Sequence, residues 1–166
     1  MKRQFASKTL TYSFDVQSII RSSDPDLARD LKVFFRGEEL PEPALLSLTV
    51  SNTGQTAIED ARVVVQLPGA TYLIPGYFVD VPPGYESLWN IERTDAEECT
   101  INFQHINPKQ VARVQLIMDE LPKGEPRISC PMPNVRCIRG SSVTLGAVAE
   151  AIVSVVAPQL LRALRM

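Results

Sequence analysis

Hydrophobic and polar residues alternate along much of the chain with a period of two. The alternation first occurs in residues 8–20 and returns in residues 45–51, where Ser47, Thr49 and Ser51 are the polar members. Because successive side chains of a β-strand point to opposite faces, each segment predicts a half-buried antiparallel strand. The hydrophobic members of the two segments are Leu10, Tyr12, Phe14, Val16, Leu46, Leu48 and Val50.

Turn-forming residues separate the predicted strands. Asn52 and Gly54 both tolerate a positive φ angle, and the small and polar residues after them let the chain cross to a new strand at residues 61–67. Pro68 and Gly69 end that strand. We therefore interpret the Asn-Thr-Gly tripeptide as a crossing between strands.

The second half of the chain continues this pattern. Residues 99–106 alternate with Ile101, Phe103 and His105 on one face, and residues 111–121 alternate through Val114, Leu116 and Met118. The polar residues 107–110, "NPKQ", link these segments, which predicts an antiparallel hairpin. Further short strands are expected in residues 31–40, with a turn at Arg36-Gly37, in residues 72–91, and twice in residues 127–140.

A short helix is expected before the second strand. Asp24 can cap its N-terminus, Pro25 suits the first helical position, and Leu27 and Leu31 are four residues apart. These signals predict one or two helical turns.

The strand spacing, near a dozen residues, favours an all-β sandwich of about seven to nine strands in residues 1–140. The stretch "LSLTVSNTGQTAIEDARVVVQLP", followed later by "INPKQVARVQLIM", resembles immunoglobulin-like β-sandwiches of the CARDB and fibronectin-III-like kind. Residues 8–60 are also similar to a segment of bacterial proteins that are often membrane-associated. The resemblance implies the fold and a non-enzymatic role, and it implies no binding residues. The chain departs from antibody-type domains because no cysteine precedes Trp89.

Residues 141–166 form a second, apolar segment. A helix is expected here, with one hydrophobic face made of Leu145, Val148, Ile152, Val156, Leu160 and Leu164. A helix over residues 143–166 is long enough to cross a bilayer, with Arg139, Arg162 and Arg165 at its ends. Glu150 and Pro158 oppose insertion. Three interpretations stay open: a helix that docks on its own copies or another protein, a membrane or interfacial helix, or a core helix of the domain.

Composition and charge narrow the function classes. The 166 residues carry a net charge of −2, so the chain lacks the basic field that nucleic-acid binding requires. The basic N-terminus is not followed by the apolar block of a secretory signal, so we expect a cytoplasmic protein. A location at the membrane surface stays open. Thirteen prolines and 45% hydrophobic residues suit a β-rich domain with a real core. We expect no cofactor.

The three cysteines are Cys99, Cys130 and Cys137. Only the last two are close enough in sequence to pair across a hairpin, and reduced thiols are expected in a cytosolic chain. A structural zinc site needs about four ligands, and the chain has one histidine, so we expect no metal.

Candidate chemistry is sparse. His105 is the sole histidine and has no nucleophile motif near it, which favours a structural or surface role. The acidic residues Asp95, Glu97 and Glu98 lack the spacing of a calcium loop and read as a solvated turn. Candidate partner contacts are the aromatic residues Tyr72, Tyr77, Phe78, Tyr85 and Trp89, although at least half of them are expected in the core.

These observations favour a non-enzymatic binding module whose apolar C-terminal helix mediates self-assembly or docks on a partner protein. The alternative is a membrane-associated sensor or effector, in which the sandwich is a regulatory head and the tail contacts a bilayer. An enzyme is the least favoured class, because no catalytic motif is recognised. It stays open only because a site can be assembled from residues far apart in the sequence.

Overall fold

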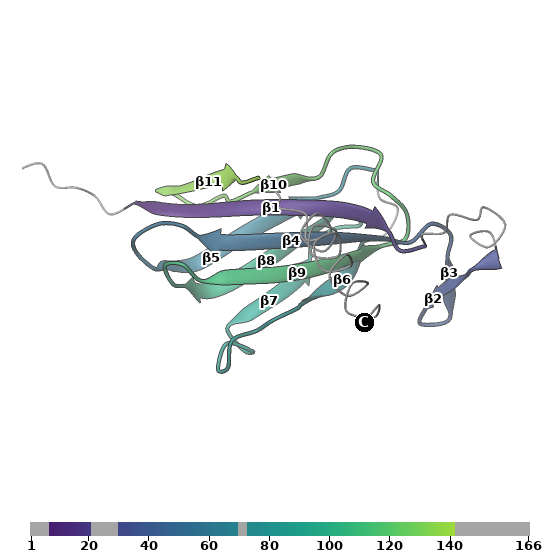
Figure 1. Ribbon diagram of the computed structural model, residues 1–166, viewed down its shortest axis with the longest axis horizontal. Helices are drawn as coiled ribbons and strands as arrows, with labels where there is room; N and C mark the ends of the chain where they lie inside the picture. The colour runs from purple at the N-terminus through teal and green to yellow at the C-terminus, as the bar shows by residue number, and fades with distance from the viewer. Residues whose placement is uncertain (1–6, 21–29, 70–72, 142–166) are drawn as a thin grey trace, which may run out of the picture.

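The computed structural model describes residues 7–20, 30–69 and 73–141, which form an all-β protein with eleven strands in three sheets (Figure 1). The strand count exceeds the seven to nine expected. The predicted helical residues Asp24, Pro25 and Leu27 lie outside the described residues, as do Tyr72 and the whole tail face from Leu145 to Leu164.

The largest sheet has five strands. Their order is β11 (Val135–Arg139), β1 (Lys8–Ser18), β4 (Ala44–Asn52), β9 (Val111–Met118) and β6 (Leu73–Phe78). All neighbours are antiparallel except β11 and β1, which are parallel. Because β11 is parallel to β1, the chain must return to the start of β1 after it has passed through all the other strands.

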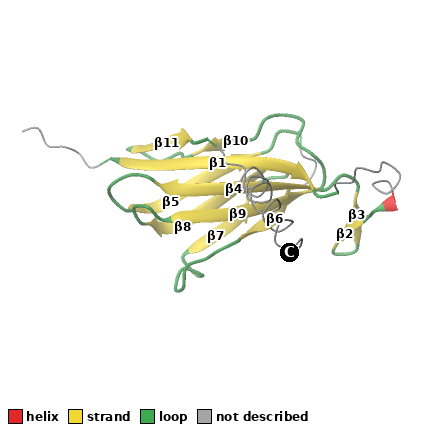
Figure 2. Ribbon diagram, in the orientation of Figure 1, coloured by secondary structure: helices red, strands yellow, loops and turns green. Residues whose placement is uncertain are grey.

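The second sheet has four antiparallel strands. Their order is β10 (Arg127–Ser129), β5 (Ile58–Gln66), β8 (Glu98–Ile106) and β7 (Trp89–Arg93). The two sheets lie one behind the other in a sandwich-like arrangement (Figure 2). The buried hydrophobic side chains of both sheets form one continuous core cluster.

The alternation predicted for the first strands is confirmed. On β4 the even-numbered residues from Ala44 to Val50 are buried, while Ser47, Thr49 and Ser51 are half-buried on the outer face. Register aligns Tyr12, Phe14 and Val16 of β1 with Val50, Leu48 and Leu46 of β4, and Leu10 with the buried Asn52. One apolar face therefore defines the inside of this sheet, as period-two alternation requires.

A third, two-stranded sheet stands apart from the sandwich. β2 (Val33–Phe35) pairs with β3 (Glu38–Leu40), and Figure 1 shows this hairpin beyond one end of both larger sheets. The predicted turn is confirmed at Arg36 and Gly37, whose φ angles of 52° and 89° are both positive. Two successive positive φ angles are typical of the tight turns that match strand twist.

The predicted hairpin between residues 99–106 and 111–121 is wrong. β8 pairs with β5 and β7, whereas β9 belongs to the other sheet and pairs with β4 and β6. The connection crosses between sheets and is tied to Asn52: the N–H of Lys109 donates to the carbonyl of Asn52 at 2.7 Å, and the N–H of Asn52 donates to Gln110 O at 3.1 Å. The alternation is the same on either sheet, so it predicts strands without choosing their partners.

The crossing predicted at the Asn-Thr-Gly tripeptide is confirmed, but the positive φ angles expected there are not found. Neither Asn52 nor Gly54 has a positive φ angle. Gly54 instead lies against β1, where a Cβ atom would come within 2.4 Å of the Ser7 carbonyl oxygen and 2.8 Å of the Thr9 nitrogen. Close backbone approach, and not turn conformation, requires glycine at this position.

Candidate functional site

Most of the aromatic residues proposed as partner contacts form a cluster between the sheets. The rings of Phe78 and Trp89 are 5.5 Å apart, and that of Trp89 meets Phe103 edge-on at 5.2 Å. Trp89 is only 3% exposed, and its indole N–H donates to the carbonyl of His105 at 3.2 Å. Edge-to-face geometry and a satisfied indole are typical of core aromatic residues. Phe78 and Trp89 therefore fill the interior.

Tyr85 closes this cluster at its polar end. Its ring packs against Trp89 at 5.3 Å and against the imidazole of His105 at 5.1 Å. The phenol oxygen lies 3.1 Å from Nε2 of His105 and accepts a hydrogen bond from the Asn107 side chain at 2.8 Å. The hydroxyl group of Tyr85 thus pairs with the side chains of His105 and Asn107 at the edge of the core, and these contacts hold the loop after β8.

Tyr77 lies elsewhere, on the outer face of the five-stranded sheet. Its side chain is 54% exposed, and its hydroxyl group hydrogen-bonds to the side chain of Gln115 on β9. The structure therefore brings Phe78, Tyr85 and Trp89 together and separates Tyr77 from them. Tyr77 is the described aromatic residue of the predicted set with the most surface available to a partner.

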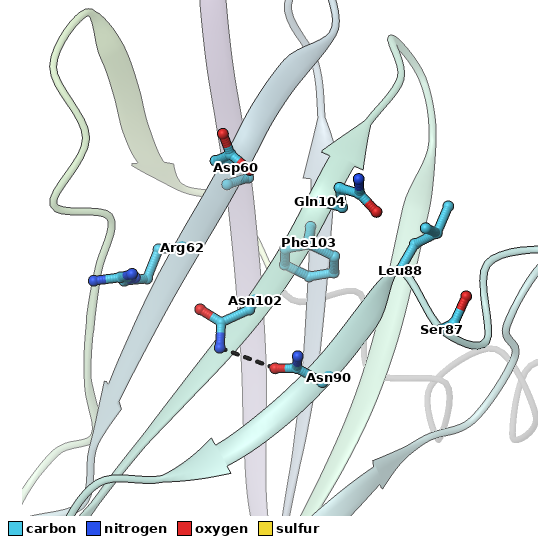
Figure 3. A pocket seen from close by; sticks show the side chains of 9 residues that line it. Asp60, Arg62, Ser87, Leu88, Asn90, Asn102, Phe103 and Gln104 are labelled. Atoms are coloured by element: carbon cyan, nitrogen blue, oxygen red, sulfur yellow. Dashed lines mark hydrogen bonds between the residues drawn. The ribbon is translucent and has the colours of Figure 1, made fainter.

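A polar hollow lies on the outer face of the four-stranded sheet (Figure 3). Its volume is about 280 Å³, and it is lined by Asp60, Ala61, Arg62, Ser87, Leu88, Asn90, Asn102, Phe103 and Gln104. Register places Arg62, Asn102 and Asn90 side by side across β5, β8 and β7. The Asn102 amide donates to Oδ1 of Asn90 at 2.9 Å.

An irregularity in β5 shapes one end of the hollow. Asp60 has a φ angle of 48°, and the pairing between β5 and β8 skips it. The inward side changes here: Ala61 and Phe103 are buried on one side of the break, and Ile58 and Ile106 on the other. His105 is therefore half-buried, and Ile106 takes the inward position that alternation assigned to His105. A non-glycine residue in the left-handed region often marks a local functional constraint.

Sequence patterns did not identify this hollow. Its polar residues occupy the outward positions of ordinary strands, where solvent alone accounts for them. Only the pairing of three strands brings the side chains into one row. The row can hydrogen-bond a polar group from a ligand, because amide, guanidinium, hydroxyl and carboxylate groups are all present.

The acidic turn forms as predicted between β7 and β8. Asp95 accepts a hydrogen bond from the Ala96 N–H at 2.7 Å, and its backbone N–H donates to Glu98 O. Within residues 7–20, 30–69 and 73–141, no three histidine, cysteine or acidic side chains are grouped to hold a metal ion. In the same ranges no helix is long and apolar enough to cross a membrane.

Exposed apolar side chains occur on the segment that carries the β2–β3 hairpin. Phe34 is 60% exposed, Leu31 48% and Ile19 41%. The hairpin is held in register by its turn and by an ion pair of 3.0 Å between Lys32 and Glu39. It therefore presents Phe34 on a structured support outside the sandwich.

No protein-family model matches the chain, and no curated protein is significantly similar to it.

Proposed function

We propose that this chain is a non-enzymatic interaction module: a cytoplasmic β-sandwich of the immunoglobulin-like, CARDB or fibronectin-III-like kind that binds protein. Its apolar C-terminal segment mediates self-assembly or docking on a partner. The observation that carries the proposal is Phe34, an aromatic residue 60% exposed on a hairpin that pairs with neither sheet. Large exposed aromatic side chains are typical contact residues of protein interfaces.

The geometry of the hairpin supports a contact role over a packing role. Among the described strands, β2 and β3 pair with each other and with no strand of the two larger sheets, so the hairpin does not extend the sandwich. An isolated two-stranded hairpin is marginally stable in water. A partner that covers Phe34 would stabilise it and remove apolar surface from solvent.

The apolar sequence of residues 141–166 is the second argument for an interaction role. Its apolar positions recur at helical spacing from Leu145 to Leu164, and an uncovered apolar face of that length is unfavourable in water. A second copy of the chain is the simplest cover, because the same face then meets itself across a two-fold axis.

The test compares the full chain with a chain ending at residue 140 by size-exclusion light scattering. The proposal expects an oligomer for the full chain and a monomer for the shortened one, with circular dichroism showing that both retain the β-sheet signal. Two monomers would overturn the self-assembly part of the proposal.

The alternative function is a membrane-associated sensor or effector with the sandwich as its regulatory head. It is favoured by the length of the apolar tail and by the arginines at its ends, Arg139, Arg162 and Arg165. It expects the full chain to co-sediment with anionic or neutral liposomes, and the chain ending at residue 140 to stay in the supernatant. A full chain that stays in the supernatant with both vesicle types would exclude it.

A further inference from the structure

Cys130 and Cys137 lie at the same edge of the sandwich, Cys130 just after an edge strand of one sheet and Cys137 within an edge strand of the other. Cys130 directly follows β10, whose last residue, Ser129, pairs with Val64 of β5. Cys137 is at the centre of β11 and pairs with Leu10 of β1. Figure 1 shows β10 and β11 along the same edge. The residues between the cysteines therefore carry the chain from one sheet to the other.

The two thiols meet across this edge. Leu10, the register partner of Cys137, is fully buried, so Cys137 lies on the inward face of β11. Both cysteines are half-buried, and a hydrogen bond between their thiols shifts the pKa of each. Cys130 also packs against the hydrophobic core. They are unbonded as thiols, and the sequence left open whether they pair.

The connecting loop holds this arrangement. The N–H of Met132 donates to the carbonyl of Cys130 at 2.8 Å, and the sulfur of Met132 accepts from the N–H of Arg62 at 3.2 Å. Asn134 has a φ angle of 63°, which reverses the chain into β11. Asparagine is among the residues that adopt this conformation most readily. The thiols thus approach each other through an ordered turn.

The hydrogen bond makes the two sulfur atoms chemically different. Donation from Cys130 lowers the pKa of the Cys137 thiol and raises that of Cys130, and burial raises the latter further. Tyr12 on β1 interacts electrostatically with both cysteines, and its pKa is raised mainly by burial and then by Cys137. Since the thiolate is the attacking species in disulfide exchange, Cys137 is the better nucleophile of the pair.

We propose that Cys130 and Cys137 are a redox site that forms a reversible disulfide by exchange with a low-molecular-weight disulfide such as oxidised glutathione. The Cys137 thiolate attacks one sulfur of oxidised glutathione, which breaks the S–S bond and releases one glutathione thiolate. Cys130, losing its proton, then attacks the Cys137 sulfur and displaces the second glutathione thiolate. Two protein thiols and one glutathione disulfide become one protein disulfide and two glutathione thiols, so electrons and protons balance.

The bond would join two short edge strands that belong to different sheets. In the part of the chain that the structure describes, β10 and β11 each have a strand partner on one side. A covalent link between them fixes the open edge of the sandwich and restricts the unfolded chain. Oxidation is therefore expected to raise the Tm by on the order of 5 °C.

Cys99 provides an internal control in the same molecule. It lies in β8 with 0% exposure, so a soluble disulfide cannot reach it in the folded protein. The Cys99 thiol should therefore stay reduced when oxidised glutathione is added.

The experiment incubates the full chain with oxidised glutathione, blocks the remaining thiols under denaturing conditions, and maps the peptides by mass spectrometry. The expected result is an intramolecular Cys130–Cys137 bond, a blocked Cys99, the rise in Tm, and reversal of both changes by dithiothreitol. Unchanged thiols at 130 and 137, stable glutathione adducts on both, or a bond that includes Cys99 would each overturn the proposal. This test needs no variant, so it does not depend on whether a mutant folds.

Two variants assign the roles, each checked by circular dichroism. Cys130→Ser should accumulate a glutathione adduct at Cys137, because the resolving thiol is absent. Cys137→Ser should form its adduct at Cys130 at least tenfold more slowly, since that thiol is the poorer nucleophile. Equal rates would overturn Cys137 as the attacking residue.

Discussion

The side-chain amide of Asn52, at the end of β4, donates a hydrogen bond of 2.9 Å to the carbonyl oxygen of Ile106, at the end of β8. The contact joins the two sheets of the sandwich. Asn52 is 0% exposed and is the buried polar residue of the described core. The same amide donates to Thr56 O at 2.9 Å, and its Oδ1 accepts from the N–H of Gly54 at 2.9 Å. Every polar atom of this side chain is therefore satisfied.

Replacing Asn52 by alanine should destabilise the protein strongly. The substitution removes the Asn52 donor from the carbonyls of Thr56 and Ile106, while the Gly54 N–H keeps its second acceptor, Thr9 O. Each buried group left unsatisfied costs about 1–3 kcal/mol. We expect a loss of roughly 2–4 kcal/mol in the free energy of unfolding, measured by urea denaturation. The matched control is Thr49→Ala, on the outer face of the same strand, with a loss of less than about 1 kcal/mol. Equal losses would refute the bridging role of Asn52.

Replacing Gly54 by alanine should loosen the start of β1. The new Cβ would lie 2.4 Å from the Ser7 carbonyl oxygen, so the backbone of the two segments must move apart. We expect destabilisation of about 2 kcal/mol and faster amide exchange at Thr53 and Gln55, which donate to Thr9 O and Ser7 O. Gly124→Ala is the control: its Cβ would meet Pro68 at an ordinary 3.5 Å, and stability should change by no more than about 0.5 kcal/mol.

Stability should fall at alkaline pH because of Cys99. Burial, and secondarily the Glu98 carboxylate, raises the pKa of this thiol from 9.0 to about 12. The folded state thus keeps its proton where the unfolded chain has lost it, so the stabilisation is full below about pH 9 and is lost as the pH rises toward 12. The slope is up to about 1.4 kcal/mol per pH unit.

The check for Cys99 compares the wild type with Cys99→Ala, both with a reductant present, by urea denaturation at several pH values. The difference in unfolding free energy between them should be constant below about pH 9 and shrink above it. A difference independent of pH would show that the thiol does not titrate with folding.

Replacing Phe34 by serine should weaken association and leave folding intact. The side chain is mostly exposed, so its loss should change the Tm of the sandwich little. If Phe34 is an interface residue, the dissociation constant of the full chain's oligomer should rise about tenfold, measured by analytical ultracentrifugation. Val111→Ser, at 42% exposure and at the opposite end of β9 from the hairpin, should leave it unchanged. The same rise in both variants would point to general hydrophobicity instead of a contact at Phe34.

Local features of the fold could be predicted from sequence where neighbouring residues cause them. The turn at Arg36 and Gly37 and the buried side of β4 both follow from residues a few positions apart. The hollow around Asn90 and Asn102 could not, because its row is built from β5, β8 and β7, and each contributes an unremarkable outward residue. For the same reason the partner role of Trp89 could not be separated from a core role before its neighbours were known.

Alternation by itself determined where strands lie and which side of each is apolar, because the period of two is a property of the single strand. Only the tertiary structure decided which sheet each strand joins, since an alternating strand buries its apolar side equally well on either layer. That choice turned the expected hairpin at residues 107–110 into a crossing and made Asn52 a bridge between layers. It also brought Cys130 and Cys137 together at the edge, because closing the sandwich is a long-range event that no local pattern records.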